Sequence, residues 1–281
     1  MSNTGIVIPE RVGAIQGNSQ ATAVEQSRAV AEVQAAVTVA QSRPRDMSRV
    51  IGDIADSCGR LAVANKAFYR VPSRGNGPSV HLARELARIW GNLDYGVREL
   101  RRDDVQGVSE IQAFAWDQQS NTRSTRTFIV PHQRMKSGKR EPLIDLGDVY
   151  LNNQNVGARA VRECIFTILP SDVVETAQDI CRKTLSDGEG VPLPQRIDKM
   201  VQSFHAQFGV KADQIETKLA KKRGQWDAGD VATMQIIYGS LARGEVSVED
   251  EFESARAKAA DLTGRDSLDV DIAQAQQDGG E

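Results

Sequence analysis

The sequence predicts an α+β fold: a small antiparallel sheet of about three to five strands packed with helices, followed by a C-terminal three-helix module. Apolar residues recur at helical spacing before residue 91 and again after residue 193. Between these stretches, residues 94–130 contain segments in which apolar and polar side chains alternate, as in strands with a buried face. Turn-forming residues separate the segments, which indicates short antiparallel connections.

Composition divides the 281 residues into five parts. We expect a flexible N-terminal tail over 1–22, an α+β core over 23–186, a linker over 187–194, a small helical module over 195–244, and an acidic, disordered tail over 245–281. The linker is rich in glycine and proline, and the final part has too few apolar residues to bury a core.

The sequence at the start of the core predicts two helices and a short strand. Ala23 to Gln41 is rich in alanine and lacks glycine and proline, which favours a long helix that Pro44 closes. A second helix is expected over about 46–65. The sequence "KAFYRVP" then indicates a short strand, and "SRGNGPS" a mobile loop.

The next helix is bounded by Ser79, a possible N-cap, and Gly91, a stop signal. Three strands follow, in "DYGVRELR", "SEIQAFAW" and "RSTRTFIV". In the second, alternation places Ile111, Ala113 and Ala115 on one face, and Glu110, Gln112, Phe114 and Trp116 on the other. A basic loop, "HQRMKSGKREP", precedes two further helices that end near Pro170 and Leu185.

Charge is unevenly distributed along the chain. The formal net charge is -3, yet residues 60–140 hold 15 Lys and Arg against 7 acids, a net of +8. Residues 245–281 hold 11 acids against 3 bases, a net of -8. A basic body with an acidic end points to a polyanionic partner.

Sequence motifs of catalysis are missing or incomplete. The nearest approach to a phosphate-binding Walker loop is "SGKR", which lacks the earlier glycine, so ATP-driven chemistry and other cofactors are not expected. Asp145 and Asp148 are the one candidate carboxylate pair for a metal, although a cap or turn is the more common role for such residues. The three cysteines suggest reduced thiols in a cytosolic protein, and we expect neither a secretory signal nor a membrane span.

The basic middle of the chain interleaves cations with aromatic rings, the two groups that non-specific binding of single strands needs. The candidate phosphate-binding residues are Lys66, Arg70, Arg74, Arg84, Arg88, Arg98, Arg101, Arg102, Arg123, Arg126, Arg134, Lys136, Lys139, Arg159 and Arg162. The candidate base-stacking rings are Tyr69, Tyr95, Phe114, Trp116 and Phe128. The alternative is that the arginines only solvate a surface and that the strand rings are buried under helices.

The order "LARELARIWGNL", "DYGVRELRR", "EIQAFAWDQQSN" and "TRTFIVPHQR" resembles the core of phage single-strand annealing proteins of the RecT/Redβ type. "AFYRVPSRGNGPSV" is similar to the strand and loop that precede their first core helix, and the similarity covers residues 45–185. A later stretch, from "QRIDKMVQSF" to "MQIIYGSLARGE", resembles a helical module at the C-terminal end of phage recombination proteins.

This resemblance implies ATP-independent annealing of complementary DNA strands by a ring or helical filament of identical copies in the cytoplasm of a bacterial host. It implies a phage exonuclease and the host single-strand binding protein as possible partners. Three alternatives stay open: a single-strand binding protein that does not anneal, a metal-dependent nuclease built around Asp145 and Asp148, and a structural oligomer without a nucleic-acid role.

Overall fold

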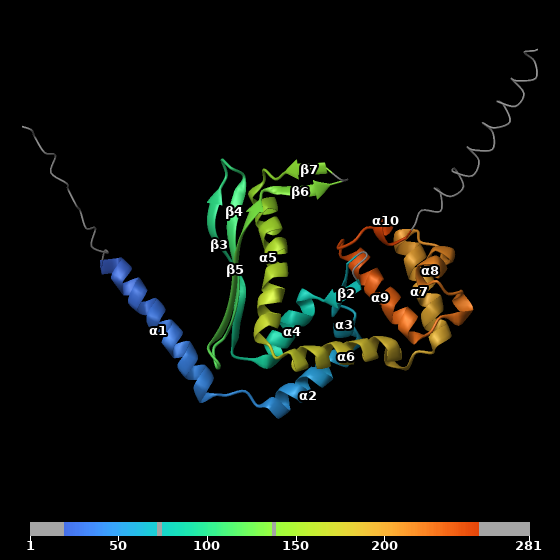
Figure 1. The fold of residues 1–281 in the computed structure, drawn as a ribbon, viewed down its shortest axis with the longest axis horizontal. Coiled ribbons are helices and arrows are strands. Elements are labelled where there is room, and N and C mark those ends of the chain that lie inside the picture. Colours follow the sequence, from blue (N-terminus) through green and yellow to red (C-terminus); the bar gives the residue numbers. More distant parts are fainter. Residues whose placement is uncertain (1–19, 72–74, 137–138, 253–281) are drawn as a thin grey trace, which may run out of the picture.

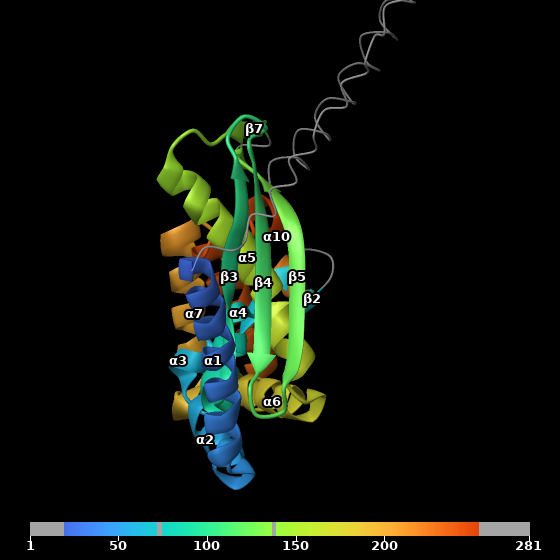
Figure 2. The ribbon, with the colours of Figure 1, turned by 90° about the vertical axis from the view of Figure 1, so that its left-hand side faces the viewer.

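The computed structural model describes residues 20–71, 75–136 and 139–252, and it confirms the α+β class. A three-stranded sheet stands at the centre, with helix α5 along one of its faces (Figure 1). Helix α1 stands apart on the opposite side of the sheet, and the C-terminal helices gather beyond α5. Figure 2 shows the same sheet face-on, with α1 crossing in front of its lower part.

The central sheet contains β3 (Leu93–Asp103), β4 (Val108–Asp117) and β5 (Thr122–Pro131), antiparallel in that order. The predicted alternation in β4 is confirmed. Its apolar positions, among them Ala113 and Ala115, are buried against α5 (Leu146–Ile168), where the Cys164 thiol lies 3.7 Å from the carbonyl oxygen of Ala113. The sheet therefore has an inner face packed on α5 and an outer face turned away from it.

Helix α5 lies unusually close to β3 at Gly157. A Cβ atom at this position would lie 2.8 Å from Cγ2 of Val97, closer than packed atoms approach. Glycine in a helix interior costs about 1 kcal/mol relative to alanine. Here the residue lets the helix backbone contact the inner face of the sheet, so packing offsets that cost.

Four helices enclose the inner side near the lower end of the sheet. They are α2 (Met47–Cys58), α3 (Leu61–Ala64), α4 (Val80–Trp90) and α6 (Ser171–Asp187). The predicted cap is confirmed, because the Ser79 hydroxyl accepts hydrogen bonds from the N–H groups of His81 and Leu82. Leu82, Leu86 and Trp90 are buried, as their helical spacing predicts. Cys58, Cys164 and Cys181 are buried free thiols.

The short strand predicted in "KAFYRVP" is confirmed as β1, but the two segments predicted as loops contain paired strands. β1 (Phe68–Val71) pairs with β2 (Gly75–Pro78), and β6 (Gln133–Lys136) pairs with β7 (Lys139–Pro142). The glycines that indicate a loop in the first segment, Gly75 and Gly77, lie within β2 itself, where they pair with Val71 and Tyr69. Gly75 begins β2 with φ of +93°, a conformation open to glycine.

The three predicted C-terminal helices are confirmed as α7 (Leu193–Phe208), α8 (Ala212–Leu219) and α9 (Ala228–Ala242). The folded part continues further than predicted, through α10 (Val248–Glu251) to Phe252, whose buried ring lies 5.7 Å from that of Phe204. The rest of the predicted acidic tail, 253–281, lies outside the described residues.

Two other predicted boundaries are wrong. Helix α1 (Gln20–Ser42) begins inside the predicted tail, of which residues 1–19 lie outside the described part. The predicted linker shortens to the five residues between Asp187 and Leu193, which include the single turn η1 (Gly188–Gly190).

Helix α9 connects the C-terminal helices to the core. In α9, Ala232 and Ile236 pack into the core cluster under the sheet, whereas Met234 and Ile237 pack into the cluster shared with α7. One helix thus serves two hydrophobic clusters. Of the described helices, none combines the length and the apolar character needed to cross a lipid bilayer.

We predict that Gly157→Ala destabilises the protein by about 1–3 kcal/mol, because the added methyl group overpacks the contact with Val97. Chemical denaturation measures the change, and Val97→Ala in the same chain should recover part of it. Gly52→Ala in α2 is the matched control, since a Cβ there meets no atom within 4 Å. Equal effects at Gly52 and Gly157 would contradict the proposed close approach.

Candidate nucleic-acid interface

The outer face of the sheet carries two aromatic rings, each covered by an arginine. The guanidinium of Arg98 on β3 lies 4.2 Å from the ring centroid of Phe114 on β4. That of Arg123 on β5 lies 4.0 Å from the ring of Trp116, two residues further along β4. Gly96 pairs with Phe114 across the strands and leaves room for its ring, since a Cβ at Gly96 would lie 3.3 Å from Phe114.

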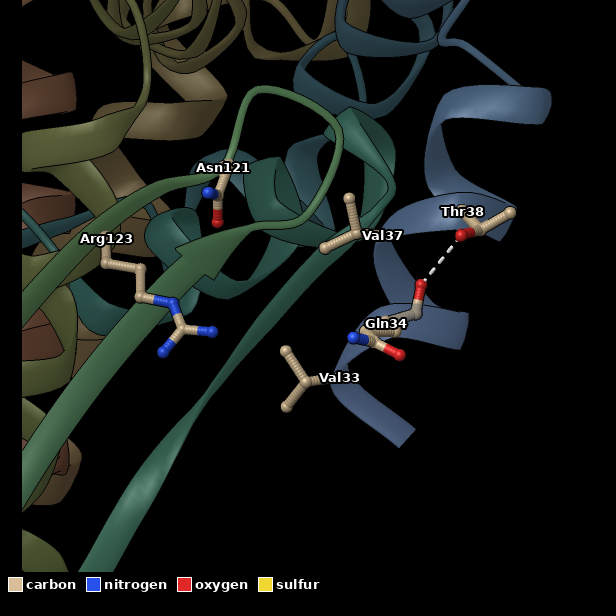
Figure 3. A pocket seen from close by; sticks show the side chains of 6 residues that line it. All are labelled: Val33, Gln34, Val37, Thr38, Asn121 and Arg123. Carbon is tan, nitrogen blue, oxygen red and sulfur yellow. Dashed lines mark hydrogen bonds between the residues drawn. The ribbon is translucent and has the colours of Figure 1, made fainter. Parts of the chain in front are cut away.

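Helix α1 faces the start of β5, including Arg123, across an open groove (Figure 3). Val33 and Val37 point from α1 towards the sheet, where Asn121 and Arg123 lie at the start of β5. Two adjoining hollows make up the groove, one of about 700 Å³ beside these residues and one of about 480 Å³ beside Phe114 and Trp116. The lining part of α1 spans ten residues, which is about 15 Å of helix.

The two arginines of the groove have no acidic partner among the described residues. The acids that line the groove are Glu32, which pairs with Arg28 at 2.9 Å, and Asp94. The guanidinium groups of Arg98 and Arg123 are exposed and held over rings, so they remain available to an anion. The groove therefore combines the ring of Phe114 with two arginines whose positive charge Asp94 offsets only in part.

Arg45 sets the position of α1 relative to the sheet. Its Nη2 atom lies 2.8 Å from both carboxylate oxygens of Asp117 at the end of β4. The same guanidinium donates to the carbonyl oxygens of Trp90 and Gly91 and lies 4.3 Å from the Trp90 ring. Because Arg45 follows α1 closely, this contact fixes the base of the groove. Sequence reasoning missed it, and its only signal was a basic residue beside Pro44.

Asp117 stays charged although it is buried. Burial by itself raises the pKa of this carboxyl group, but hydrogen bonds from Arg45, from the Trp90 indole and from the Ser120 backbone N–H outweigh that effect. The net result is a pKa below the usual value for aspartate. The ion pair with Arg45 is consequently intact at neutral pH.

The arginines of α4 belong to another surface. Arg84 and Arg88 are exposed, but α4 packs on α5, on the inner side of the sheet (Figures 1 and 2). Arg88 forms a 2.6 Å ion pair with Glu85, which also accepts a hydrogen bond from Ser57 of α2. These two arginines therefore do not line the groove that contains Arg98.

The far end of β3 holds arginines that are already paired. Arg101 contacts Asp103 at 2.9 Å, and Arg102 contacts Asp104 at 2.6 Å. With a strand rise of about 3.3 Å per residue, Arg101 is roughly 26 Å along the strand from Leu93. The candidate phosphate-binding residues from Arg84 to Arg102 therefore lie in separate places.

Several other predicted cations have structural partners. Arg70 pairs at 3.2 Å with the buried Glu251 and so links β1 to α10. Arg162 pairs with Glu163 at 2.7 Å and lies 4.5 Å from the Tyr69 ring. Both arginine side chains are therefore engaged in contacts within the protein. The Arg162 guanidinium also covers one side of the Tyr69 ring.

The remaining cations are scattered. Lys66, Arg126 and Arg159 are exposed and have no acidic partner among the described residues. Arg134 lies 4.0 Å from both Glu141 and Asp148. The backbones of Lys136 and Lys139 pair in the β6–β7 hairpin, whereas their side chains and all of Arg74 lie outside what the structure describes.

Two predicted stacking rings face the wrong way. Tyr95 and Phe128 lie opposite Ala115 and Ile111 in the strand register, and so belong to the inner face. Both rings pack against the core cluster. Side chains alternate between the two faces of a sheet, so Tyr95 and Phe128 point away from the face that carries Phe114 and Trp116. This position argues against a role in stacking bases.

A buried polar network near the upper end of the sheet superficially suggests nucleophilic chemistry. The hydroxyl of Ser109 lies 2.8 Å from Nε2 of His132, whose Nδ1 atom lies 3.8 Å from Asp104. However, Ser109 is fully buried, and its hydroxyl is oriented to donate to Glu99 at 3.3 Å. The histidine then donates to the serine instead of accepting its proton, so this network does not generate a nucleophile.

The carboxylate pair considered for a metal also has a structural explanation. Asp145 is the N-cap of α5, and its Oδ1 atom accepts hydrogen bonds from the N–H groups of Gly147 and Asp148. Across the described ranges, no group of three or more His, Cys, Asp or Glu side chains is placed to hold a metal ion.

We predict that Asp117→Asn costs about 3–5 kcal/mol of folding free energy at pH 7, because it leaves the buried Arg45 without a counter-charge. The folded-state pKa of Asp117 is lowered, so its stabilisation is present above the unfolded pKa of about 3.9 and is lost as pH falls through the folded value. Urea denaturation at pH 7 and pH 3 tests both points.

In that experiment, the parent protein should lose more stability on acidification than Asp117→Asn does. Asp53→Asn, at a half-exposed site on α2, is the control and should change stability by less than about 0.5 kcal/mol. The same acid sensitivity in parent and Asp117→Asn proteins would contradict the assignment.

Comparison with protein-family models, with curated proteins and with solved structures found no match for this chain. The likeness to RecT/Redβ-type annealing proteins consequently rests on the order and pattern of the residues quoted above. The function must be argued from the groove itself.

Proposed function

We propose that the chain binds single-stranded DNA in the groove between α1 and the outer face of the sheet, and that it promotes ATP-independent annealing of complementary strands. The observation that carries this proposal is the pair of ring–arginine stacks, Phe114 with Arg98 and Trp116 with Arg123, side by side in that open groove. Phe114 is partly exposed, and a ring of this kind stacks on bases of any sequence. Trp116 is buried, so at that position the exposed Arg123 guanidinium is the group that can bind a phosphate.

The geometry suggests how a strand is held. A base stacks on the exposed part of Phe114, or on the flat guanidinium that covers the ring. Stacking uses the face of a base and leaves its Watson–Crick edge free. A strand held in this way is both protected and able to pair with its complement, which is the requirement for annealing.

A homo-oligomer is part of the proposal. In α1, Val24, Val30 and Val39 are more than half exposed, and Ala40 is its one buried residue. A helix with so little tertiary packing gains stability when another copy covers it. Ring or filament geometry, a phage exonuclease and a host single-strand binding protein as partners, and a bacterial cytoplasmic location follow only from the resemblance.

Annealing separates this proposal from plain single-strand binding. Two complementary oligonucleotides, one carrying a fluorophore and the other a quencher, are mixed with protein in the absence of nucleotide. The proposed function predicts faster quenching than in protein-free solution. Binding that slows quenching instead would favour a coating protein, and binding that is insensitive to salt would favour neither.

We predict that replacing Arg98 and Arg123 together by Ala weakens binding of a single strand roughly ten- to hundredfold, since two charge-assisted contacts are lost. The plot of log affinity against log salt should become shallower by about 1.4, or about 0.7 for each lost phosphate contact. Fluorescence anisotropy over a salt series measures both quantities.

The matched control is Arg84→Ala with Arg88→Ala, which removes the same charge from α4. These variants should retain the parent salt slope if the groove is the binding site. A larger loss in the α4 variant would instead place the strand on the inner side of the molecule.

A further inference from the structure

A second cavity, of about 590 Å³, lies between the core and the C-terminal helices. Its lining comes from α3, α4, η1, α7 and α9 together with neighbouring loop residues. The apolar part of the wall includes Leu61, Val191, Met200 and Phe204. The cavity is separate from the proposed groove. The groove is built by α1 and the sheet, whereas the C-terminal helices lie on the other side of α5 (Figure 1).

The polar part of this cavity is cationic. Lys66, Arg196, Lys199 and Arg243 line it together with His81, and none of the described lining residues is acidic. Partial burial and then the nearby cations, Arg243 first, lower the pKa of His81. Glu245 pairs with Arg243 at 2.8 Å, but Lys66 and Lys199 have no acidic partner among the described residues. An anionic ligand would relieve this excess of positive charge.

One cavity residue also lacks a hydrogen-bond donor. The Oε1 atom of Gln235 is buried and accepts no hydrogen bond from the described residues. A buried carbonyl oxygen left in this state costs about 1–3 kcal/mol. A backbone N–H group of a bound peptide is a suitable donor, and it would arrive together with apolar and acidic side chains.

The sequence beyond Phe252 contains such a peptide. Residues 266–272 read "DSLDVDI", with three aspartates and three branched apolar residues in seven and no lysine or arginine. The whole stretch 253–281 holds 7 acids against 3 bases, a net of -4. Its charge and its apolar content thus match the two kinds of surface in the cavity.

The chain is long enough to make this contact. Its described part ends at Phe252, which packs on Phe204, a residue of the cavity wall. Thirteen residues separate Phe252 from Asp266, and the chain between the two reaches roughly 45–50 Å when extended. A helix with its side chains is only about 10–12 Å in diameter, so the chain is long enough to pass one and reach the cavity.

We propose that residues 266–272 dock in the cavity between α7, α9 and the start of α4, with aspartates at Lys66, Lys199 and Arg243 and the apolar side chains against Met200 and Phe204. Attachment to the same chain gives the segment a local concentration in the millimolar range, so a weak peptide contact suffices. This inference stands independently of whether the groove binds DNA.

Disulfide trapping in the full chain tests the contact. Ser203 lines the cavity, and Ser267 lies in the segment, so the variant Ser203→Cys with Ser267→Cys should form an intramolecular disulfide under mild oxidation. The native thiols at positions 58, 164 and 181 are buried and do not compete. Gln202→Cys with Ser267→Cys is the matched control, since Gln202 is adjacent on α7, exposed and outside the cavity lining.

The expected result is at least tenfold faster trapping at position 203 than at position 202, and a further change should slow it. Lys199→Glu in the Ser203 variant should reduce trapping several-fold, whereas Lys183→Glu, an exposed reversal on α6, should not. Equal rates at 202 and 203, no effect of Lys199→Glu, or a disulfide that joins two chains would each overturn the proposal.

Discussion

The buried ion pair between Arg45 and Asp117 is the interaction on which the rest of the arrangement depends. It joins the segment after α1, the end of α4 and the end of β4 at one point, with the Trp90 indole donating to the same carboxylate. Both charged groups are largely removed from water and are satisfied by several hydrogen bonds. These bonds fix the relative positions of the three segments. Removing the pair would weaken the attachment of α1 to the sheet, leaving the hydrogen bonds from Asn92 to the carbonyl oxygens of Ala40 and Arg43.

The sheet serves two purposes because its strands have two faces. The inner face is filled by small and apolar residues that α5 approaches closely at Gly157. The outer face carries the partly exposed Phe114 and the buried Trp116, each beneath the guanidinium group of an exposed arginine. Burial of the inner face thus stabilises the sheet, whose outer face remains open to a ligand. The cationic cavity near α9 is a separate feature, since different elements build it.

Much of this architecture is predictable from local pattern. Alternation in β4 predicts which residues share a face, and the Ser79 cap and the stripe of Leu82 and Leu86 predict α4 and its buried side. The site is harder to predict because it depends on contacts distant in sequence. Arg70 and Arg162 have the same residue type as Arg98, yet their acidic partners engage them. Tyr95 and Phe128 are separated from Phe114 by strand register, and Arg45 acquires its importance from a partner 72 residues away.

The central claim is that a single strand lies against Phe114 and the guanidinium groups of Arg98 and Arg123, opposite α1. Photocrosslinking with an oligonucleotide that carries 5-iododeoxyuridine, followed by mass spectrometry of the adducts, locates the bases directly. The account predicts adducts at Phe114, Trp116 or the facing residues 29–38 of α1, and a strong reduction in the Arg98 and Arg123 double variant. Adducts concentrated at Tyr69, His81 or Tyr238, with none in the groove, would contradict it.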